Sequence, residues 1–153
     1  MKIGIIITSF NNEETLEKTI RSAAALKKNN NIYIILIDDC SSDSSLKIAE
    51  LARRKNQIDL VKINKKNLGV SKCRNIGIKL CSKTNYITFL DGDDYINPKF
   101  SKIFNKKLYG DLITFDFEYL YKNKILINNF YKDDKKLITN DIKKYFLDYL
   151  TKP

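Results

Sequence analysis

Residues 3–8 read Ile-Gly-Ile-Ile-Ile-Thr, and this nearly continuous apolar run predicts a strand buried on both faces of a parallel sheet. Residues 32–37 (Ile-Tyr-Ile-Ile-Leu-Ile) repeat the pattern. Between the two runs, apolar residues recur at helical spacing, and Asn11 with Glu14 three residues later forms a capping-box pattern at the start of that helix. The chain therefore opens with a strand, a helix and a second strand.

The same alternation continues to residue 90. The spacing predicts a helix that begins within 41–43 and runs to about residue 55, a strand at 58–63, a helix over 70–80 and a strand at 85–90. This β-α-β-α-β-α-β order is typical of an α/β fold with an open, mostly parallel sheet and helices on both faces, as in Rossmann-like domains.

The last third of the chain has a less regular pattern. It predicts a short helix at 99–108, a bent strand or hairpin from the apolar stretches 111–117 and 119–127, and a final amphipathic helix at 142–150. No repeat, linker or low-complexity block divides the sequence, so we predict a single domain over residues 1–153.

Composition excludes several classes of protein and site. The chain has no histidine, and its three cysteines form no CxxC pair, which excludes a Cys/His zinc site, a histidine general base and a Ser-His-Asp triad. No apolar run approaches the ~20 residues that span a bilayer, and the first run is too short for a signal peptide, so we expect a cytoplasmic protein. The net charge of +10 is compatible with nucleic acid, anionic membrane surfaces or anionic substrates.

Polar clusters follow three of the predicted strands. They are Thr8-Ser9-Phe10-Asn11, the segment 38–43 (Asp-Asp-Cys-Ser-Ser-Asp) and Asp91-Gly92-Asp93-Asp94. Ligands of open α/β sheets bind beyond the carboxyl ends of parallel strands, so the three clusters are expected to form one site. Asn11 and the residues at 41–43 are equally compatible with a role as simple helix caps.

The acidic cluster at 91–94 gives the strongest chemical signal. Its three carboxylates repel one another unless a cation or several donors offset their charge, and carboxylate oxygens suit Mg²⁺ or Mn²⁺. The glycines form neither GxGxxG nor a P-loop, so a bound diphosphate needs a metal and a nearby cation. Arg74 is a candidate for that cation, although the residues alone leave open a solvated acidic turn and an ordinary surface arginine.

Four segments, 5–13, 35–43, 67–75 and 86–98, resemble in order and spacing the motifs of inverting family 2 glycosyltransferases with a GT-A fold. The resemblance covers about the first 108 residues. This chain departs from the family pattern in having Thr8 where proline is common and Cys40 where glycine is common, and neither change removes a charged ligand.

The resemblance implies a nucleotide-sugar donor, with UDP as its nucleotide, and Mn²⁺ or Mg²⁺ as the cofactor. Phe10 would stack on the base beside Thr8, Asp39 would accept from the uracil ring N–H, and Arg74 would approach base or phosphate. Asp91 would contact the ribose or metal, and Asp93 would bind the metal that bridges the diphosphate. The full set of implied donor and metal residues is Thr8, Phe10, Asn11, Glu13, Asp39, Arg74, Asp91, Gly92 and Asp93.

The resemblance also implies an acidic general base from an acceptor-binding half, and no motif identifies it among Asp111, Asp116 and Glu118. We therefore expect the N-terminal donor-binding part of a longer enzyme. Its acceptor would be a saccharide or lipid-linked saccharide of a cell-surface glycan. The enzyme itself is expected to associate peripherally with the cytoplasmic side of an anionic membrane. Self-association through the last helix is also expected. A non-catalytic nucleotide-sugar-binding module and, after it, a basic nucleic-acid-binding protein are the alternatives.

Overall fold

The structure is a computed structural model that describes residues 1–29, 31–97, 112–113, 118–121, 124–127 and 138–139. The chain falls into two compact units, Met1–Lys106 and Lys107–Pro153. The single domain over residues 1–153 stays a prediction.

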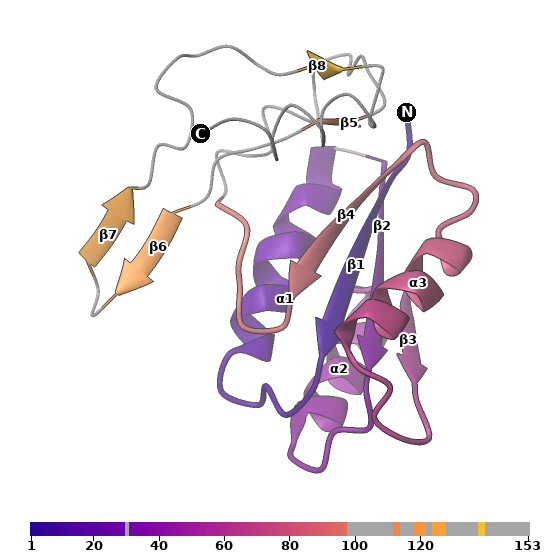
Figure 1. Ribbon diagram of the computed structural model, residues 1–153, viewed down its shortest axis with the longest axis vertical. Coiled ribbons are helices and arrows are strands. Elements are labelled where there is room, and N and C mark those ends of the chain that lie inside the picture. Colours follow the sequence, from indigo (N-terminus) through magenta and orange to yellow (C-terminus); the bar gives the residue numbers. More distant parts are fainter. Residues whose placement is uncertain (30, 98–111, 114–117, 122–123, 128–137, 140–153) are drawn as a thin grey trace, which may run out of the picture. The chain divides into compact units, whose positions relative to one another are not determined.

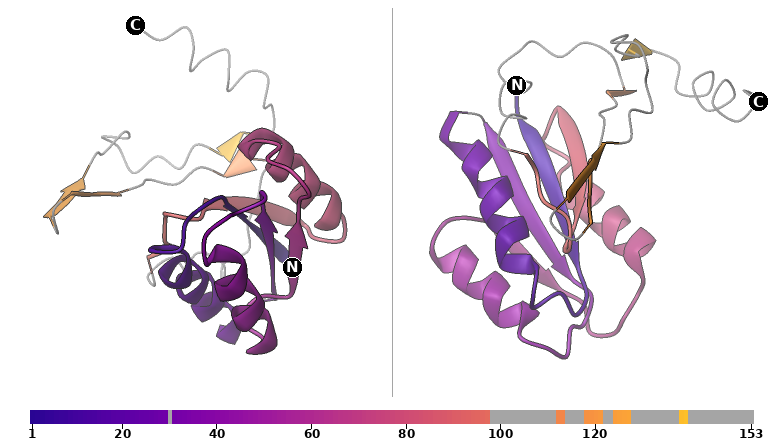
Figure 2. Two further views of the ribbon diagram at one scale, coloured as in Figure 1. Left: turned by 90° about the horizontal axis from the view of Figure 1, so that it is seen from below. Right: turned by 90° about the vertical axis from the view of Figure 1, so that its left-hand side faces the viewer.

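The first unit contains a four-stranded, all-parallel sheet in the order β3-β2-β1-β4 (Figure 1). Its strands are β1 (Ile3–Ser9), β2 (Ile32–Asp38), β3 (Leu60–Ile63) and β4 (Tyr86–Asp91). The helices are α1 (Leu16–Ala24) with the short 3₁₀ helix η1 (Ala25–Asn29), α2 (Ser45–Arg54) and α3 (Val70–Leu80). Figure 2 shows α1 and α2 on one face of the sheet and α3 on the other. The predicted α/β architecture is confirmed.

The two central strands carry the core. Every residue of β1 is buried, and so is every residue of β2 except Tyr33. On the face under α3, Ile6, Ile35 and Ile37 pack with Cys73 and other buried side chains. These apolar runs are covered on both sides, which explains why they lack the alternation of a half-exposed strand.

Two predicted boundaries are corrected by local hydrogen bonds. The capping box is wrong: α1 begins at Leu16 after Thr15, with no side-chain cap, because Asn11 turns its amide toward the loop after β2. β3 begins at Leu60 rather than residue 58, because both the amide and the carboxylate of Asp59 bond to the backbone of Ile34.

The second unit contains two short antiparallel pairs. β6 (Glu118–Tyr121) pairs with β7 (Lys124–Ile127), and β5 (Leu112–Ile113) pairs with β8 (Ile138–Thr139). The hairpin therefore spans residues 118–127, and its turn lies inside the predicted stretch 119–127 rather than between that stretch and 111–117, because Tyr121 pairs with Lys124 across a two-residue connection. The helices predicted at 99–108 and 142–150 lie outside the described residues, as do Asp111 and Asp116.

Candidate functional site

The strand register brings the three polar clusters to one rim of the sheet. Ser9 is the parallel partner of Asp38 on β2, and Thr8 is the partner of Asp91 on β4. The loops that follow these strands therefore emerge side by side at the carboxyl ends, as the sequence predicts.

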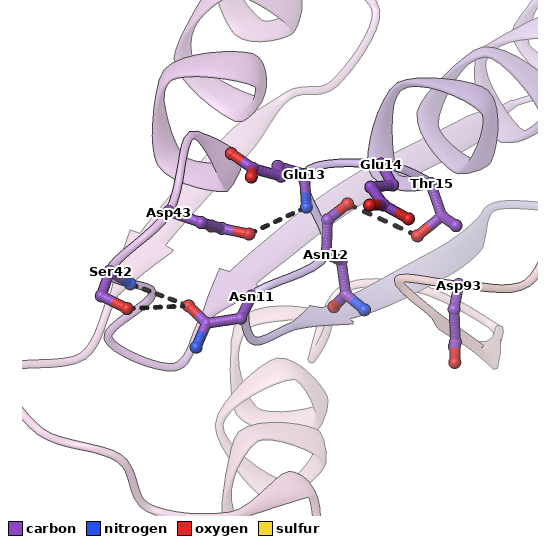
Figure 3. Close-up of a pocket in the computed structure, with 8 residues that line it drawn as sticks. All are labelled: Asn11, Asn12, Glu13, Glu14, Thr15, Ser42, Asp43 and Asp93. Atoms are coloured by element: carbon purple, nitrogen blue, oxygen red, sulfur yellow. Dashed lines mark hydrogen bonds between the residues drawn. The ribbon is translucent and has the colours of Figure 1, made fainter.

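The loops after β1 and β2 are joined by reciprocal hydrogen bonds between side chains and backbone (Figure 3). The amide N–H of Ser42 donates to Asn11 Oδ1 over 2.9 Å. Glu13 donates its own N–H to Asp43 Oδ2 over 2.9 Å, while its Oε2 accepts from the N–H of Ser44 over 2.9 Å. Asn11 and Glu13 are both predicted to contact the nucleotide-sugar donor. In this structure their side chains accept hydrogen bonds from the loop after β2 and so fix the shape of the rim.

The Asp43 carboxylate accepts from both segments of this junction, from the N–H of Glu13 and the N–H of Ser45. Desolvation opposes its ionisation, but hydrogen bonds from Ser45 and from the Glu13 amide outweigh that effect and lower its pKa. The carboxylate is therefore held charged by the two segments it links, which accounts for Asp43 without a ligand.

Phe10 stands at the rim with its side chain in solvent. It is 46% exposed, and its backbone N–H donates to Asn12 Oδ1 over 2.9 Å. An exposed aromatic ring on a backbone held in this way offers a flat face on which a nucleic-acid base can stack.

Asp39 is buried and holds the loop that leads into α3. Its carboxylate accepts from the backbone N–H groups of Leu68 (2.9 Å) and Gly69 (2.8 Å), and from Asn64 Nδ2 (2.8 Å). Burial opposes ionisation, but these hydrogen bonds outweigh it and lower the pKa. The Cys73 thiol is a further hydrogen-bonding partner that lowers this pKa, so four groups of the protein engage the carboxylate.

Arg74, Asp91 and Thr8 form a cluster on the α3 side of the rim. Arg74 Nη2 lies 2.8 Å from Oδ1 and 3.0 Å from Oδ2 of Asp91, and Thr8 Oγ1 donates to the same Oδ1 over 3.0 Å. The guanidinium carbon lies 5.4 Å from the centre of the Phe89 ring, and Nε is buried with no hydrogen-bond partner within residues 1–97. The cation and the first acid of the acidic turn are therefore already paired.

Asp93 has a different environment from Asp91. Its side chain is exposed and makes no hydrogen bond or ion pair with the part of the chain that the structure describes. The neighbouring Asp94 has a raised pKa, first because of partial burial and then because of the charges of Asp93 and Asp91. Negative charge is therefore concentrated on this turn, and no basic side chain of the described residues forms an ion pair with Asp93.

Gly92 lets the acidic turn approach the β1 loop. A Cβ atom on it would lie 2.5 Å from Asn12 Oδ1 and 3.1 Å from the Thr8 carbonyl oxygen. A larger residue would force the Asn12 side chain or the turn to shift, so Gly92 serves close packing of the turn against the β1 loop.

The residues on this turn fit a divalent cation that is shared with a phosphate. Mg²⁺ typically binds one or two protein carboxylates and completes its shell with phosphate oxygens and water, and Mn²⁺ favours the same hard oxygen ligands. Asp93 supplies one free carboxylate, while Asp91 is engaged by Arg74. No group of three or more potential metal-binding side chains occurs among the described residues, so they do not form an all-protein cage.

A cavity of about 500 Å³ opens on the α1 side of this rim (Figure 3). Its lining residues are Asn11, Asn12, Glu13, Glu14, Thr15, Ser42, Asp43 and Asp93. The lining is acidic, so it repels an anion that arrives without a cation. Seven of the nine predicted residues therefore separate into three groups: Asn11, Glu13 and Asp93 line the cavity, Thr8, Arg74 and Asp91 form the α3-side cluster, and Asp39 holds the loop at 64–69.

Three hydroxyl residues that contact the acidic turn, at the N-cap of α1 and within the helix, are not among the predicted site residues. Thr15 and Thr19 donate to backbone carbonyls of residues 92 and 94, and Ser22 accepts from the amide of Ile96. A stripe of hydroxyl residues at positions 15, 19 and 22 of an otherwise apolar helix face was the available signal.

Comparison with known proteins agrees with this geometry. The family model described as "Glycosyl transferase family 2" matches residues 4–142. The poly(ribitol-phosphate) beta-N-acetylglucosaminyltransferase TarS of Staphylococcus aureus is 29% identical over 100 residues, 65% of this chain and 17% of TarS. The cholesterol galactosyltransferase of Borreliella burgdorferi is 35% identical over 111 residues, 72% of this chain and 30% of that protein.

Solved structures show the same fold. S. aureus TarS 1–349 in complex with UDP-GlcNAc superposes with a TM-score of 0.56 and 30% identity, covering 67% of this chain and 30% of that one. The Pyrobaculum calidifontis mannosyltransferase PcManGT, in complex with GDP-Man and Mn²⁺, has a TM-score of 0.56 at 12% identity, covering 61% and 28%. This chain spans less than a third of the two relatives matched by sequence. It belongs to glycosyl transferase family 2 and has the GT-A fold.

Proposed function

We propose that the rim formed by β1, β2 and β4 binds a UDP-linked sugar together with Mn²⁺ or Mg²⁺, and that the protein transfers the sugar to a saccharide acceptor. The observation that carries this proposal is the free, exposed carboxylate of Asp93 on the turn whose first acid, Asp91, is neutralised by Arg74. The S. aureus TarS structure that contains UDP-GlcNAc supports the choice of donor.

Each residue of the rim has a role that follows from its surroundings. Phe10 presents a ring face for the base, and Asp39 supplies a carboxylate oxygen that would accept from a uracil N–H. Arg74 lies within hydrogen-bond distance of Asp91. From this position its positive charge can also contact an anionic nucleotide-sugar donor. Asp93 would bind the cation, and the bound cation would neutralise the charge of the leaving diphosphate.

The relatives are named for different acceptors. One of them is named for transfer to poly(ribitol-phosphate) and another for transfer to cholesterol. We propose a saccharide or lipid-linked saccharide of a cell-surface glycan. Glu118, a candidate general base, lies in the second unit at the start of β6.

A site of action at an anionic membrane surface on the cytoplasmic side is also proposed. The stretch from residue 60 to residue 90 contains no acidic residue. Its basic residues are Lys62, Lys65, Lys66, Lys72, Arg74, Lys79 and Lys83. Within the described part of the chain, none of the helices has the length and apolar character needed to cross a bilayer. Co-sedimentation with phosphatidylglycerol vesicles, but not with phosphatidylcholine vesicles, is the expected result.

The donor proposal is tested by calorimetric titration of the 153-residue chain with UDP, with and without Mn²⁺. Binding that requires or is strengthened by Mn²⁺ supports it, and the absence of UDP binding under both conditions overturns it. A transfer assay with UDP-sugars and saccharide acceptors then separates an enzyme from a non-catalytic binding module. Binding to an oligonucleotide instead of UDP would favour the nucleic-acid alternative.

A further inference from the structure

Helix α1 presents a row of hydroxyl groups to the segment that contains the acidic turn. Thr15 is the N-cap residue of α1, and Thr19 and Ser22 lie within the helix; the three follow helical spacing and so share one side of it. Thr19 is only 1% exposed, and its hydroxyl is satisfied by backbone carbonyls. The turn is thus bonded to a helix that precedes it by about seventy residues in the sequence.

The individual contacts fix the backbone on both sides of Asp93. Thr15 Oγ1 donates to the Gly92 carbonyl over 2.9 Å. Thr19 Oγ1 lies 2.6 Å from the Asp94 carbonyl oxygen and 3.0 Å from that of Gly92. A hydroxyl has a single proton, so Thr19 donates to the nearer oxygen, of Asp94, and Thr15 serves Gly92.

Ser22 extends the contact by one turn of the helix. Its Oγ accepts from the Ile96 N–H over 3.0 Å and donates to the Thr19 carbonyl over 2.7 Å. The Asp94 N–H bonds within the turn to the Asp91 carbonyl oxygen over 3.0 Å. Residues 92, 94 and 96 are therefore each held through the backbone, whereas the Asp93 side chain is left unbonded and exposed.

We propose that Thr15, Thr19 and Ser22 are positioning residues that hold the acidic turn so that the Asp93 carboxylate is ready to bind the cation of the donor complex. This inference rests on the proposed function. Because the turn is ordered before the ligand arrives, binding does not have to supply the free energy of ordering it. Loss of the hydroxyls therefore weakens metal-dependent binding while Asp93 itself is intact.

The decisive variant is Thr19→Val, which keeps the shape of the side chain and removes its hydroxyl. Thr19→Ser restores the hydroxyl and is the rescue variant. The matched control is Thr84→Val, since Thr84 Oγ1 also donates to a backbone carbonyl, that of Cys81 over 2.8 Å, but precedes the start of β4 at the other end of the sheet.

Two measurements read out the effect. In calorimetric titration with UDP, we expect Thr19→Val to lose about 10-fold in Mn²⁺-dependent affinity, while Thr19→Ser and Thr84→Val stay within about 3-fold of the unmodified chain. In hydrogen exchange of the ligand-free protein, we expect the Asp94 and Ile96 amides to exchange faster in Thr19→Val, with the amides of β1 unchanged.

The two measurements distinguish a failure of this inference from a failure of the proposed function. No UDP binding by the unmodified chain overturns the proposed function. Equal Mn²⁺-dependent affinity in Thr19→Val and the unmodified chain overturns this inference alone, even if exchange becomes faster. If Thr19→Val does not fold, Thr15→Val at the partly exposed end of the row takes its place, and unchanged affinity there overturns the inference.

Discussion

Arg74 Nη2 lies 2.8 Å and 3.0 Å from the two carboxylate oxygens of Asp91, so one nitrogen joins the start of α3 to the end of β4. Both side chains are partly exposed, at 36% and 41%. The pair places the cation and the first acid of the proposed donor site in contact before any donor is bound. A bound diphosphate would then compete with Asp91 for Arg74, or extend the ion pair.

The strength of this ion pair is predicted to be modest. A double-mutant cycle with Arg74→Met and Asp91→Asn should give a coupling energy of about 0.5–1 kcal/mol in the free energy of unfolding, because partly exposed pairs are screened by solvent. Methionine keeps an apolar chain near Phe89. The coupling should decrease in 1 M salt. Denaturant unfolding of the four proteins measures it, and no coupling at low salt would contradict the prediction.

Asp93→Asn should remove the metal-dependent part of UDP binding. The substitution deletes one negative charge at an exposed position without breaking a protein hydrogen bond, so the free energy of unfolding should change by less than about 0.5 kcal/mol. At a fixed Mn²⁺ concentration, UDP affinity should fall about 10-fold or more. The matched control is Glu14→Gln, an exposed acid that lines the same cavity. An equal loss in both variants would show that general negative charge, rather than Asp93, is responsible.

Asp39→Asn should destabilise the fold in a pH-dependent way. An amide has one acceptor oxygen where the carboxylate has two, so one of the donors at Asn64, Leu68 and Gly69 loses its partner, at a cost of about 1–3 kcal/mol near pH 7. The folded-state pKa of Asp39 lies below its ordinary 3.8. Its contribution to stability is therefore complete above about pH 5, and decreases as the pH falls through 4 and then through the lower folded-state pKa.

Urea unfolding of Asp39→Asn beside the unmodified chain, from pH 7 to pH 3, measures this difference. The comparison isolates Asp39, because every other titrating group is common to both proteins. A difference in unfolding free energy that grows as the pH falls would contradict the sign derived from the lowered pKa.

The sheet was predictable from local sequence, because strands buried on both faces need long aliphatic runs such as 3–8 and 32–37. The meeting of the three clusters followed from parallel topology alone. The partners of individual polar groups were not predictable. Asn11 was read as a helix cap or a ligand, yet its acceptor is used by Ser42, thirty-one residues away. Such choices depend on which loops become neighbours, and a single sequence does not encode that locally.

The hydrogen-bond partner of Thr19 was also not predictable from the sequence. A threonine inside a helix is unremarkable in the sequence, and its hydroxyl usually bonds to the preceding turn of its own helix. Only the packing of α1 beside the end of β4 turns that hydroxyl toward the Asp94 carbonyl. The charges of the acidic turn mark it in the sequence, whereas the residues that hold it are neutral and are marked only by their helical spacing.

Cys40→Gly should stabilise the protein. Cys40 is exposed and has a φ of 69°, a left-handed conformation that costs a residue with a Cβ about 1–2 kcal/mol. Glycine removes this strain but adds freedom to the unfolded chain, so we expect a net gain of up to about 1 kcal/mol. Cys40→Ser, which removes the thiol and keeps the strain, is the control and should give no gain. Gly69, at a φ of 85° with open space around its missing Cβ, provides the reverse test: Gly69→Ala should cost about 1–3 kcal/mol through backbone strain alone. Thermal and urea unfolding compare the three variants, and a stabilising Cys40→Ser would show that the thiol, rather than the backbone, was responsible.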